Sequence, residues 1–445
     1  MKRHVDRTLS AALLCMAALT HTPARSADLT EVYAMAAEND PEFRRVAANK
    51  RAILELRPQA IADLLPAVNL TGNTYNNDQD ISAGFVVGGS GSSELDFNSH
   101  GYALNLSQPL FRTDRWLRLR QANSQIRQAD AELTAAQQDL MLRTSLAYFL
   151  VLGAGDNLQF AEAEKKSLSR QLEQAKQRFE VGLTAITDVQ EAQAGYDRAV
   201  AQEIAAQNDL SVQHEVLRQI TGQYLTDLAV LGDDMPLVNP EPEDIEQWTT
   251  TALDQNAQVQ AQLYAVETAR EEIKVQFTGH LPTLDLVARH GYDKSGGRFS
   301  DSKVHATAVG LELNVPIFQG GYVNSRTREA RQRLDASLES LELARRQTQR
   351  QTRASYLSVI SGISQVKAFK QALVSSETAL EATNAGFEVG TRTAVDVVAA
   401  ERLTSQARRD FARSKYDYIL NTIRLKQAAG TLSDQDLSLI NQWLR

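Results

Sequence analysis

The chain has 445 residues and a formal net charge of −8, with 55 Asp and Glu against 47 Lys and Arg. A net negative charge argues against nucleic acid as a partner, because polyphosphates attract basic surfaces. The single cysteine excludes an internal disulfide and a zinc site built on several cysteines.

The sequence lacks the motifs of the common enzyme classes. Its seven histidines show no His-Glu-x-x-His spacing, and no Gly-x-Ser-x-Gly occurs. No glycine-rich loop ends in the Gly-Lys-Ser or Gly-Lys-Thr that binds phosphate. We therefore predict that the protein is not an enzyme and has no catalytic residues, no cofactor and no metal site.

Residues 1–26 have the organisation of a secretory signal peptide. Lys2 and Arg3 open the chain, an apolar run of about a dozen residues follows, and the small residues Ala24 and Ser26 end it. The run is too short to span a bilayer as a helix. We expect cleavage next to Ser26 and export of the remaining chain.

The chain contains two copies of one plan. Val181 and Gly182 recur as Val389 and Gly390, within longer matching segments, at an offset of 208 residues. Three further matches keep the same order: Leu65-Pro66 with Leu281-Pro282, Pro109-Leu110-Phe111 with Pro316-Ile317-Phe318, and Gly222 with Gly430. This pattern indicates tandem duplication, with repeats at 27–235 and 251–445 and a linker at 236–250.

Each repeat is expected to begin with a short helix and to continue with two β-strands. The strands lie near 66–79 and 98–110 in the first repeat and near 282–294 and 304–316 in the second. In the second repeat, for example, Leu311 and Leu313 alternate with Glu312 and Asn314. This period-2 pattern is typical of membrane barrel strands. A soluble hairpin has it too, but its recurrence behind a signal peptide favours the membrane.

Four strands cannot close a barrel on their own, and an open sheet edge is not tolerated in lipid. If these strands lie in a membrane, several copies of the chain must therefore combine. Three copies would supply twelve strands, which is enough for one closed barrel. A membrane barrel built from these strands therefore requires an oligomer.

Long helices are predicted after each strand pair, because none of the ten prolines falls between Pro109 and Pro236 or after Pro316. The expected helices are 112–178 and 187–220 in the first repeat and 320–385 and 394–430 in the second. The first of them would be roughly 100 Å long. Gly182 and Gly390 interrupt the helices, so each repeat is expected to end in a helical hairpin.

Four segments resemble those of TolC-type outer-membrane efflux and secretion proteins, and the similarity covers nearly the whole chain after the predicted signal peptide. They are Val181-Gly182-Leu183-Thr184-Ala185-Ile186-Thr187-Asp188-Val189-Gln190, Gly279-His280-Leu281-Pro282-Thr283-Leu284-Asp285-Leu286, Val315-Pro316-Ile317-Phe318-Gln319-Gly320-Gly321 and Val389-Gly390-Thr391-Arg392-Thr393-Ala394-Val395-Asp396-Val397. The resemblance implies a mainly helical α+β fold and a homotrimer. Its duplicated helix–hairpin units would form a twelve-stranded outer-membrane β-barrel continuous with a twelve-helix periplasmic α-barrel.

The resemblance also implies a function, that of the exit duct of a tripartite efflux pump, a type I secretion system, or both. The protein would lie in the outer membrane and extend into the periplasm. The implied partners are outer-membrane lipid, a periplasmic adaptor and an inner-membrane transporter. The hairpin tips, with Val181, Gly182, Val389 and Gly390, are the expected docking elements. The cargo is not indicated.

In this family an aspartate on the last hairpin points into the narrowest opening of the tunnel, and the matching residue is Asp396. Three copies would form an anionic ring that favours cations. Some members have a second aspartate where this chain has Ala399, so the resemblance implies a single ring. Helix capping is an alternative role for Asp396, and also for Asp188.

The family gate is held shut by a polar network near the tips. Its matching members are Gln171, Thr187, Asp188, Phe387 and Arg392, with an arginine–aspartate pair as the main latch. Phe387 stands where other members have a tyrosine, so a hydrogen bond of about 0.5–1.5 kcal/mol per subunit is lost. We therefore expect a gate that opens more easily and depends more on Arg392.

A different class of protein, a soluble periplasmic coiled-coil scaffold or adaptor, is the alternative. Its helical hairpins would be binding surfaces and its strands a small cap domain. The lipid-facing alternation of the strands discriminates between the two. Phe111, Trp116, Phe318 and Tyr322 leave two interpretations open, because they suit an aromatic belt at a membrane interface and also packing where strands meet helices.

Overall fold

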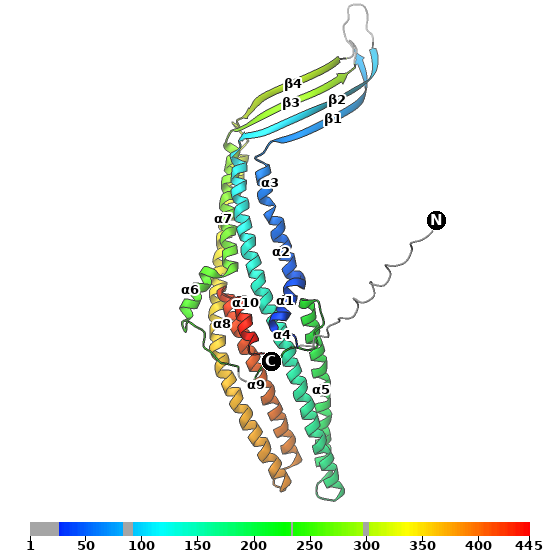
Figure 1. Ribbon diagram of the computed structural model, residues 1–445, viewed down its shortest axis with the longest axis vertical. Coiled ribbons are helices and arrows are strands. Elements are labelled where there is room, and N and C mark those ends of the chain that lie inside the picture. The colour runs from blue at the N-terminus through cyan, green and yellow to red at the C-terminus, as the bar shows by residue number, and fades with distance from the viewer. Residues whose placement is uncertain (1–25, 83–91, 233–234, 297–301) are drawn as a thin grey trace, which may run out of the picture.

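The computed structural model describes residues 26–82, 92–232, 235–296 and 302–445. The predicted signal peptide, apart from Ser26, lies outside these residues, as do most of the two strand loops. The chain forms one elongated body, with a β-sheet at one end and bundled helices over the rest (Figure 1). In the described part of the chain, no helix is both long and apolar enough to cross a membrane.

The sheet has four antiparallel strands in the order β1-β2-β3-β4. They are β1 (Ala67–Ser82), β2 (Ser92–Phe111), β3 (Thr283–Ser295) and β4 (Ser302–Asn314). β2 begins before the expected position 98, because the residues from Ser92 onward pair with β1. β4 ends before Pro316, which has no backbone N–H to pair. Since β2 pairs with β3, both repeats contribute to one sheet.

One face of the sheet is apolar near the helices. Leu70 of β1 lies opposite Leu104 of β2, and the two side chains are 72% and 44% exposed. Leu311 of β4, on the same face, is 65% exposed. The opposite face carries polar pairs such as Asn69 with Asn105. An exposed apolar face of this extent indicates contact with lipid or with another protein.

The long helices form one antiparallel hairpin in each repeat. α4 (Thr113–Glu180) turns back into α5 (Ile186–Thr221), and α8 (Tyr322–Glu388) turns back into α9 (Ala394–Ala429). The first helix of each hairpin ends at Glu180 and Glu388, beyond the expected 178 and 385, because each helix continues almost to the glycine of the turn.

The remaining helices are short. They are α1 (Leu29–Asn39), α2 (Pro41–Leu54), α3 (Leu56–Ala62), α6 (Ile245–Gln255), α7 (Ala257–Phe277), the 3-10 helix η1 (Thr278–His280) and α10 (Asp434–Asn441). Three of them replace the single helix expected before β1. The first break follows from capping, because Asp40 accepts the Phe43 N–H at 2.6 Å and Pro41 begins the next helix.

The stretch 236–250, predicted to be a linker, is partly helical, because α6 begins inside it at Ile245. Asp244 caps this helix by accepting the Glu246 N–H at 2.8 Å. Trp248 is only 7% exposed and belongs to the main core. The connection between the repeats is therefore packed against the body.

The main core lies at mid-length, where both repeats meet. Residues from α1, α4, α5, α6, α8, α9 and α10 form one apolar cluster there. Tyr148 is fully buried, its ring packs edge-on against Phe149 at 5.5 Å, and its hydroxyl donates to the Ala229 carbonyl at 2.7 Å. Ile419 and Ile423 of α9 are also fully buried. This cluster joins the two hairpins.

Two glycines end helices inside this region. Gly222 ends α5 with a φ of 73° beside Asn39, and Gly430 ends α9 with a φ of 77° beside Gln255 and Asn256. Asn256 also donates to the Ala428 carbonyl at 3.0 Å. As a result α2 and α3 continue the line of α5 along α4, and α7 begins at the end of α9 and lies along α8 (Figure 1). The described residues thus form four helical columns in each chain.

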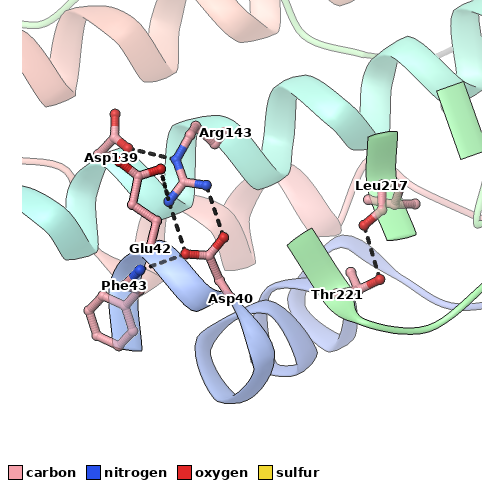
Figure 2. Close-up of polar contacts among 7 residues, drawn as sticks. All are labelled: Asp40, Glu42, Phe43, Asp139, Arg143, Leu217 and Thr221. Atoms are coloured by element: carbon pink, nitrogen blue, oxygen red, sulfur yellow. Dashed lines mark hydrogen bonds and ion pairs between the residues drawn. The ribbon is translucent and has the colours of Figure 1, made fainter. Parts of the chain in front are cut away.

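Charged residues stabilise the junction between α1 and α2, which lies beside the end of α5 (Figure 2). Asp40 is 3% exposed, and Arg143 of α4 donates to its two carboxylate oxygens at 3.0 and 3.2 Å. Asp139 accepts another bond from Arg143 at 2.7 Å. Burial raises the pKa of Asp40, but hydrogen bonds from Arg143 and Phe43 outweigh it and hold this pKa below its usual 3.8. The corner between α1 and α2 is therefore tied to α4 by a pair that stays ionised.

We expect Gly430→Ala to destabilise the fold more than Gly222→Ala. Both glycines have a positive φ, which strains an alanine by about 1 kcal/mol. At Gly430 an added Cβ would lie 2.5 Å from the Gln255 carbonyl oxygen, whereas at Gly222 the nearest atom is 3.4 Å away. Chemical unfolding of detergent-purified protein, followed by helical circular dichroism, compares the two. Equal losses of unfolding free energy would mean that Gln255 moves aside.

Candidate functional site

The two helical hairpins turn in the same way at their tips. Gly182 and Gly390 have φ values of 77° and 79°. The N–H groups of Leu183 and Thr391 each bond back, at 2.8 Å, to a carbonyl in the last turn of the preceding helix. This arrangement is the Schellman turn, which requires a left-handed residue and therefore favours glycine. Both tips are thus rigid, repeat-related turns.

Both turns expose apolar side chains. Val181, Leu183 and Val389 are 69%, 76% and 76% exposed. The predicted docking glycines, Gly182 and Gly390, lie next to the two valines and have open space around them. Each hairpin therefore ends in a small apolar surface with a fixed backbone, which suits contact with another protein.

The second helix of each hairpin begins differently. Asp396 accepts the Thr393 N–H at 2.9 Å, and the Thr393 hydroxyl accepts the Asp396 N–H at 3.3 Å, which makes a capping box for α9. In α5 the cap position is Ala185, and the Asp188 carboxylate accepts the Thr184 hydroxyl instead. The capping alternative thus applies to Asp396 and not to Asp188.

The capping contacts also affect the pKa of Asp396. Hydrogen bonds from the backbone and the hydroxyl of Thr393, together with the charge of Arg392, hold the pKa of Asp396 below its usual 3.8. The side chain is therefore an anion at any physiological pH. Within the described part of one chain, no group of three or more His, Cys, Asp or Glu side chains could hold a metal ion.

The predicted gate residues lie toward the same end but are not joined within one chain. Thr187 and Asp188 occupy the first turn of α5, and Gln171 lies on α4 about 15 Å from its end. Among the described residues, no hydrogen bond or ion pair links Arg392 to any of these three, and the buried Oε1 atom of Gln171 has no partner. The latch remains a prediction that needs a neighbouring chain.

Arg178 is a tip residue that the sequence did not indicate. Its guanidinium lies 4.6 Å from the centre of the Phe387 ring, and its Nη1 donates to the Phe387 carbonyl at 3.5 Å. This contact joins the last turn of α4 to the last turn of α8. A signal was present, because Arg178 aligns with Gly386 in the repeat, so the two copies differ here.

Farther from the tips, two buried carboxylates join α4 to α9. Glu401 of α9, 8% exposed, accepts the hydroxyl of Ser167 of α4. Glu164 of α4, 5% exposed, pairs with Arg409 of α9 at 3.4 Å. Removing one partner of a buried pair leaves an uncompensated charge. These contacts therefore hold the two hairpins of a chain in one register.

Comparison with known proteins finds an outer-membrane protein family that matches most of the chain. The model of the outer membrane efflux protein family matches residues 32–223 and 248–431. Outer membrane protein TolC of Vibrio cholerae serotype O1 is 40% identical over 427 residues, which cover 94% of each chain. Alkaline protease secretion protein AprF of Pseudomonas aeruginosa is 31% identical, over 93% of this chain and 86% of its own. The solved Campylobacter jejuni CmeC outer membrane channel has the same fold, with a TM-score of 0.79 at 16% identity over 94% of this chain and 90% of its own.

We expect Arg178→Gln to loosen the second hairpin tip. An exposed cation–π contact contributes about 0.5–1 kcal/mol, so local opening should become roughly two to five times more frequent. Hydrogen exchange of peptides covering residues 386–393, followed by mass spectrometry, measures this. Lys176→Gln is the matched control, because it removes a positive charge from an exposed position near the end of the same helix. The same exchange in both variants would mean that Arg178 does not restrain the tip.

Proposed function

The chain belongs to the outer membrane efflux protein family, and from this premise we propose that three copies of it form one duct. The protein is an outer-membrane exit duct for efflux and type I secretion, in line with its similarity to an outer membrane protein and to a protease secretion protein. It lies in the outer membrane and extends into the periplasm. The alternative of a soluble periplasmic scaffold is not supported, because these relatives are outer membrane and secretion proteins.

The sheet carries the proposal of a trimer. Its apolar face is exposed at Leu70 and Leu311, and its outermost strands, β1 and β4, each have one strand neighbour within the chain. An open edge cannot persist in lipid, so β4 of one copy pairs with β1 of the next. Three copies then close a barrel of twelve strands. The four helical columns of each chain continue it as a twelve-column tunnel.

The hairpin tips are the proposed docking site for a periplasmic adaptor and, through it, an inner-membrane transporter. The tips lie at the end of the molecule opposite the sheet (Figure 1). Their exposed apolar residues, Val181, Leu183 and Val389, stand on rigid turns. A rigid apolar surface loses little freedom on binding, which favours association. Gly182 and Gly390 adopt the left-handed conformation on which the shape of these turns depends.

At the same end, Asp396 forms the proposed constriction. Its carboxylate is held ionised by Thr393, so three copies around one axis make a ring of negative charge. Such a ring favours cations and binds multivalent cations most strongly. Capping and ring formation are compatible, because a carboxylate that accepts bonds from Thr393 retains lone pairs for a cation.

The latch is proposed to lie between neighbouring subunits. Arg392 and Asp188 occupy corresponding levels of the two tips, and neither makes an ion pair with the other within the described part of one chain. Pairing across the subunit boundary would therefore join one copy to the next. Thr187 and Gln171 lie on the same hairpin as Asp188 and complete the network. Phe387 contributes through Arg178 instead of through a hydroxyl.

Imaging and conductance of the detergent-purified protein test the duct. We expect tapered threefold particles well over ~100 Å long, and channels in planar bilayers. A soluble monomer would contradict the duct. Arg392→Ser should raise the closed-state conductance, whereas Arg413→Ser, an exposed arginine on the side of α9, should not. Equal conductance in the two variants would contradict the latch.

Block by a trivalent cation tests the ring. Asp396→Asn should weaken the block strongly, because it removes the charge. In the wild type the block should disappear as the pH falls through the pKa of Asp396. Thr393→Ala removes one of the bonds that lower this pKa, so the block should disappear at a higher pH. Thr391→Ala is the control, since its hydroxyl bonds to Gly386. An unchanged pH profile in Thr393→Ala would refute the link between cap and ring.

A further inference from the structure

The apolar face of the sheet changes character toward the strand loops. Near the helices this face carries leucine and valine, as in Leu311 and Val309, which are 65% and 72% exposed. Beyond Thr307 it carries rings and basic groups. We call this second part the basic–aromatic row; its members are His100 and Tyr102 of β2, His290, Tyr292 and Lys294 of β3, and Lys303 and His305 of β4.

The strand register puts all members of the row on one face. Tyr102 lies directly opposite Tyr292, and Tyr292 lies directly opposite His305. Lys294 is opposite both His100 and Lys303. Because residues that are opposite in an antiparallel pair share a face, the row extends across three strands.

Ring contacts make the row a single cluster. The Tyr292 ring lies 5.9 Å from that of Tyr102, 4.8 Å from that of His305 and 6.2 Å from that of His100. His290 Nδ1 is 2.7 Å from the Thr307 hydroxyl, which fixes the orientation of its ring. The row is therefore an ordered surface on a rigid sheet.

The depth of the row can be derived from strand geometry. His305 is eight residues beyond Leu313 on β4, which is about 27 Å along a strand. With the usual barrel tilt this is roughly 20 Å along the membrane normal, close to the ~25 Å height of an apolar band. Phe318 and Tyr322, beyond the helix end of β4, are 87% and 63% exposed. If the apolar face lies against lipid, as proposed, the row would therefore lie at the level of the outer-leaflet headgroups.

The charges of the face are separated along the strands. Within the row every charged or titratable group apart from the tyrosines is basic. Among the described strand residues, carboxylates on the same face lie only farther toward the tip of the first hairpin, at the opposed pairs Asp78 with Asp96 and Asp80 with Glu94. Asp293 is paired with Gly101 on the other face. A basic layer between an apolar band and an acidic tip is complementary to a layer of phosphate.

Lys303 strengthens this argument. Its side chain is exposed at the end of β4 that lies farthest from the helices, so its ammonium group is accessible to a phosphate group. Tyrosine and histidine rings next to the lysines match the interfacial belt of membrane proteins.

We propose that the basic–aromatic row binds the phosphate groups of anionic lipid headgroups in the outer leaflet. The proposal rests on the proposed function, which puts the apolar face against lipid. Lys303 supplies charge, and the histidines and tyrosines supply hydrogen bonds at the headgroup level. Each trimer would then carry three equivalent sites, one on each four-stranded segment of the barrel.

The test measures which lipids stay with the protein. The full-length protein is reconstituted in phosphatidylcholine vesicles that contain a minor fraction of diphosphoryl lipid A, and is then cut out in polymer-bounded discs. The ratio of the two lipids in the discs is compared with that in the vesicles. We expect enrichment of lipid A in the wild type, and a loss of about fivefold in that enrichment for Lys303→Gln.

The matched control is Arg289→Gln, which removes one positive charge from the opposite face of β3, next to His290. It should leave the enrichment unchanged, and Lys303→Arg should retain it. Inorganic phosphate added to the discs should not displace the lipid; displacement would identify a site for free phosphate and overturn the proposal. Equal enrichment in Lys303→Gln and wild type would also overturn it.

Channel recordings on the same preparations separate this result from the duct itself. If all variants conduct but none differs in lipid content, the row does not bind headgroups and the duct stands. If the wild type neither conducts nor forms threefold particles, the duct proposal fails, and the lipid-facing assignment of the row fails with it.

Discussion

The rest of the molecule depends on how its helices end at mid-length. A helix as long as α4 needs support along its whole length, but its hairpin partner α5 covers only part of it. Gly222 and Gly430 solve this by turning the chain in the left-handed conformation, so that another helix can begin beside each end. Asp40 and Arg143 then fix the direction of the new helix (Figure 2). Because these junctions lie within the main core, both hairpins extend from one packed centre.

The two repeats share this framework and differ at the hairpin tips. Both tips have the same glycine turn, since its geometry depends only on local backbone bonds. At the start of the following helix, however, the second copy has the Thr393–Asp396 capping box and the first has Ala185. A cap that lowers the pKa of a carboxylate suits the charged ring proposed for Asp396. The predicted duplication thus accounts for the shared architecture, and the differences at a few tip positions accompany the proposed gate.

The chemistry of the surface changes along the length of the molecule. At one end, the apolar sheet face is followed along the strands by the basic–aromatic row and then by the acidic strand tip. In the proposed duct this order matches the membrane interior, the lipid headgroups and water. At mid-length the core is apolar and closed. Toward the hairpin tips the contacts between α4 and α9 become polar, as in Glu164 with Arg409. Because a buried pair is costly to break, these contacts keep the two hairpins of a chain in one register between the core and the tips.

The sequence by itself determined the duplication, the strands and the long helices, because periodicity, proline and glycine act locally. α10 was not predicted, because eight residues are too few to reveal a period, although Ser433 and Asp436 form a capping box at its start. The resemblance led to Asp396, helix capping was the alternative role that its position suggested, and the structure shows the capping box with Thr393. Tertiary structure alone decided that Arg178 meets Phe387, 209 residues away, and that the rings of β2, β3 and β4 form one row. Such contacts depend on strand register and on how hairpins pack, and no local pattern specifies which distant side chains those will bring together.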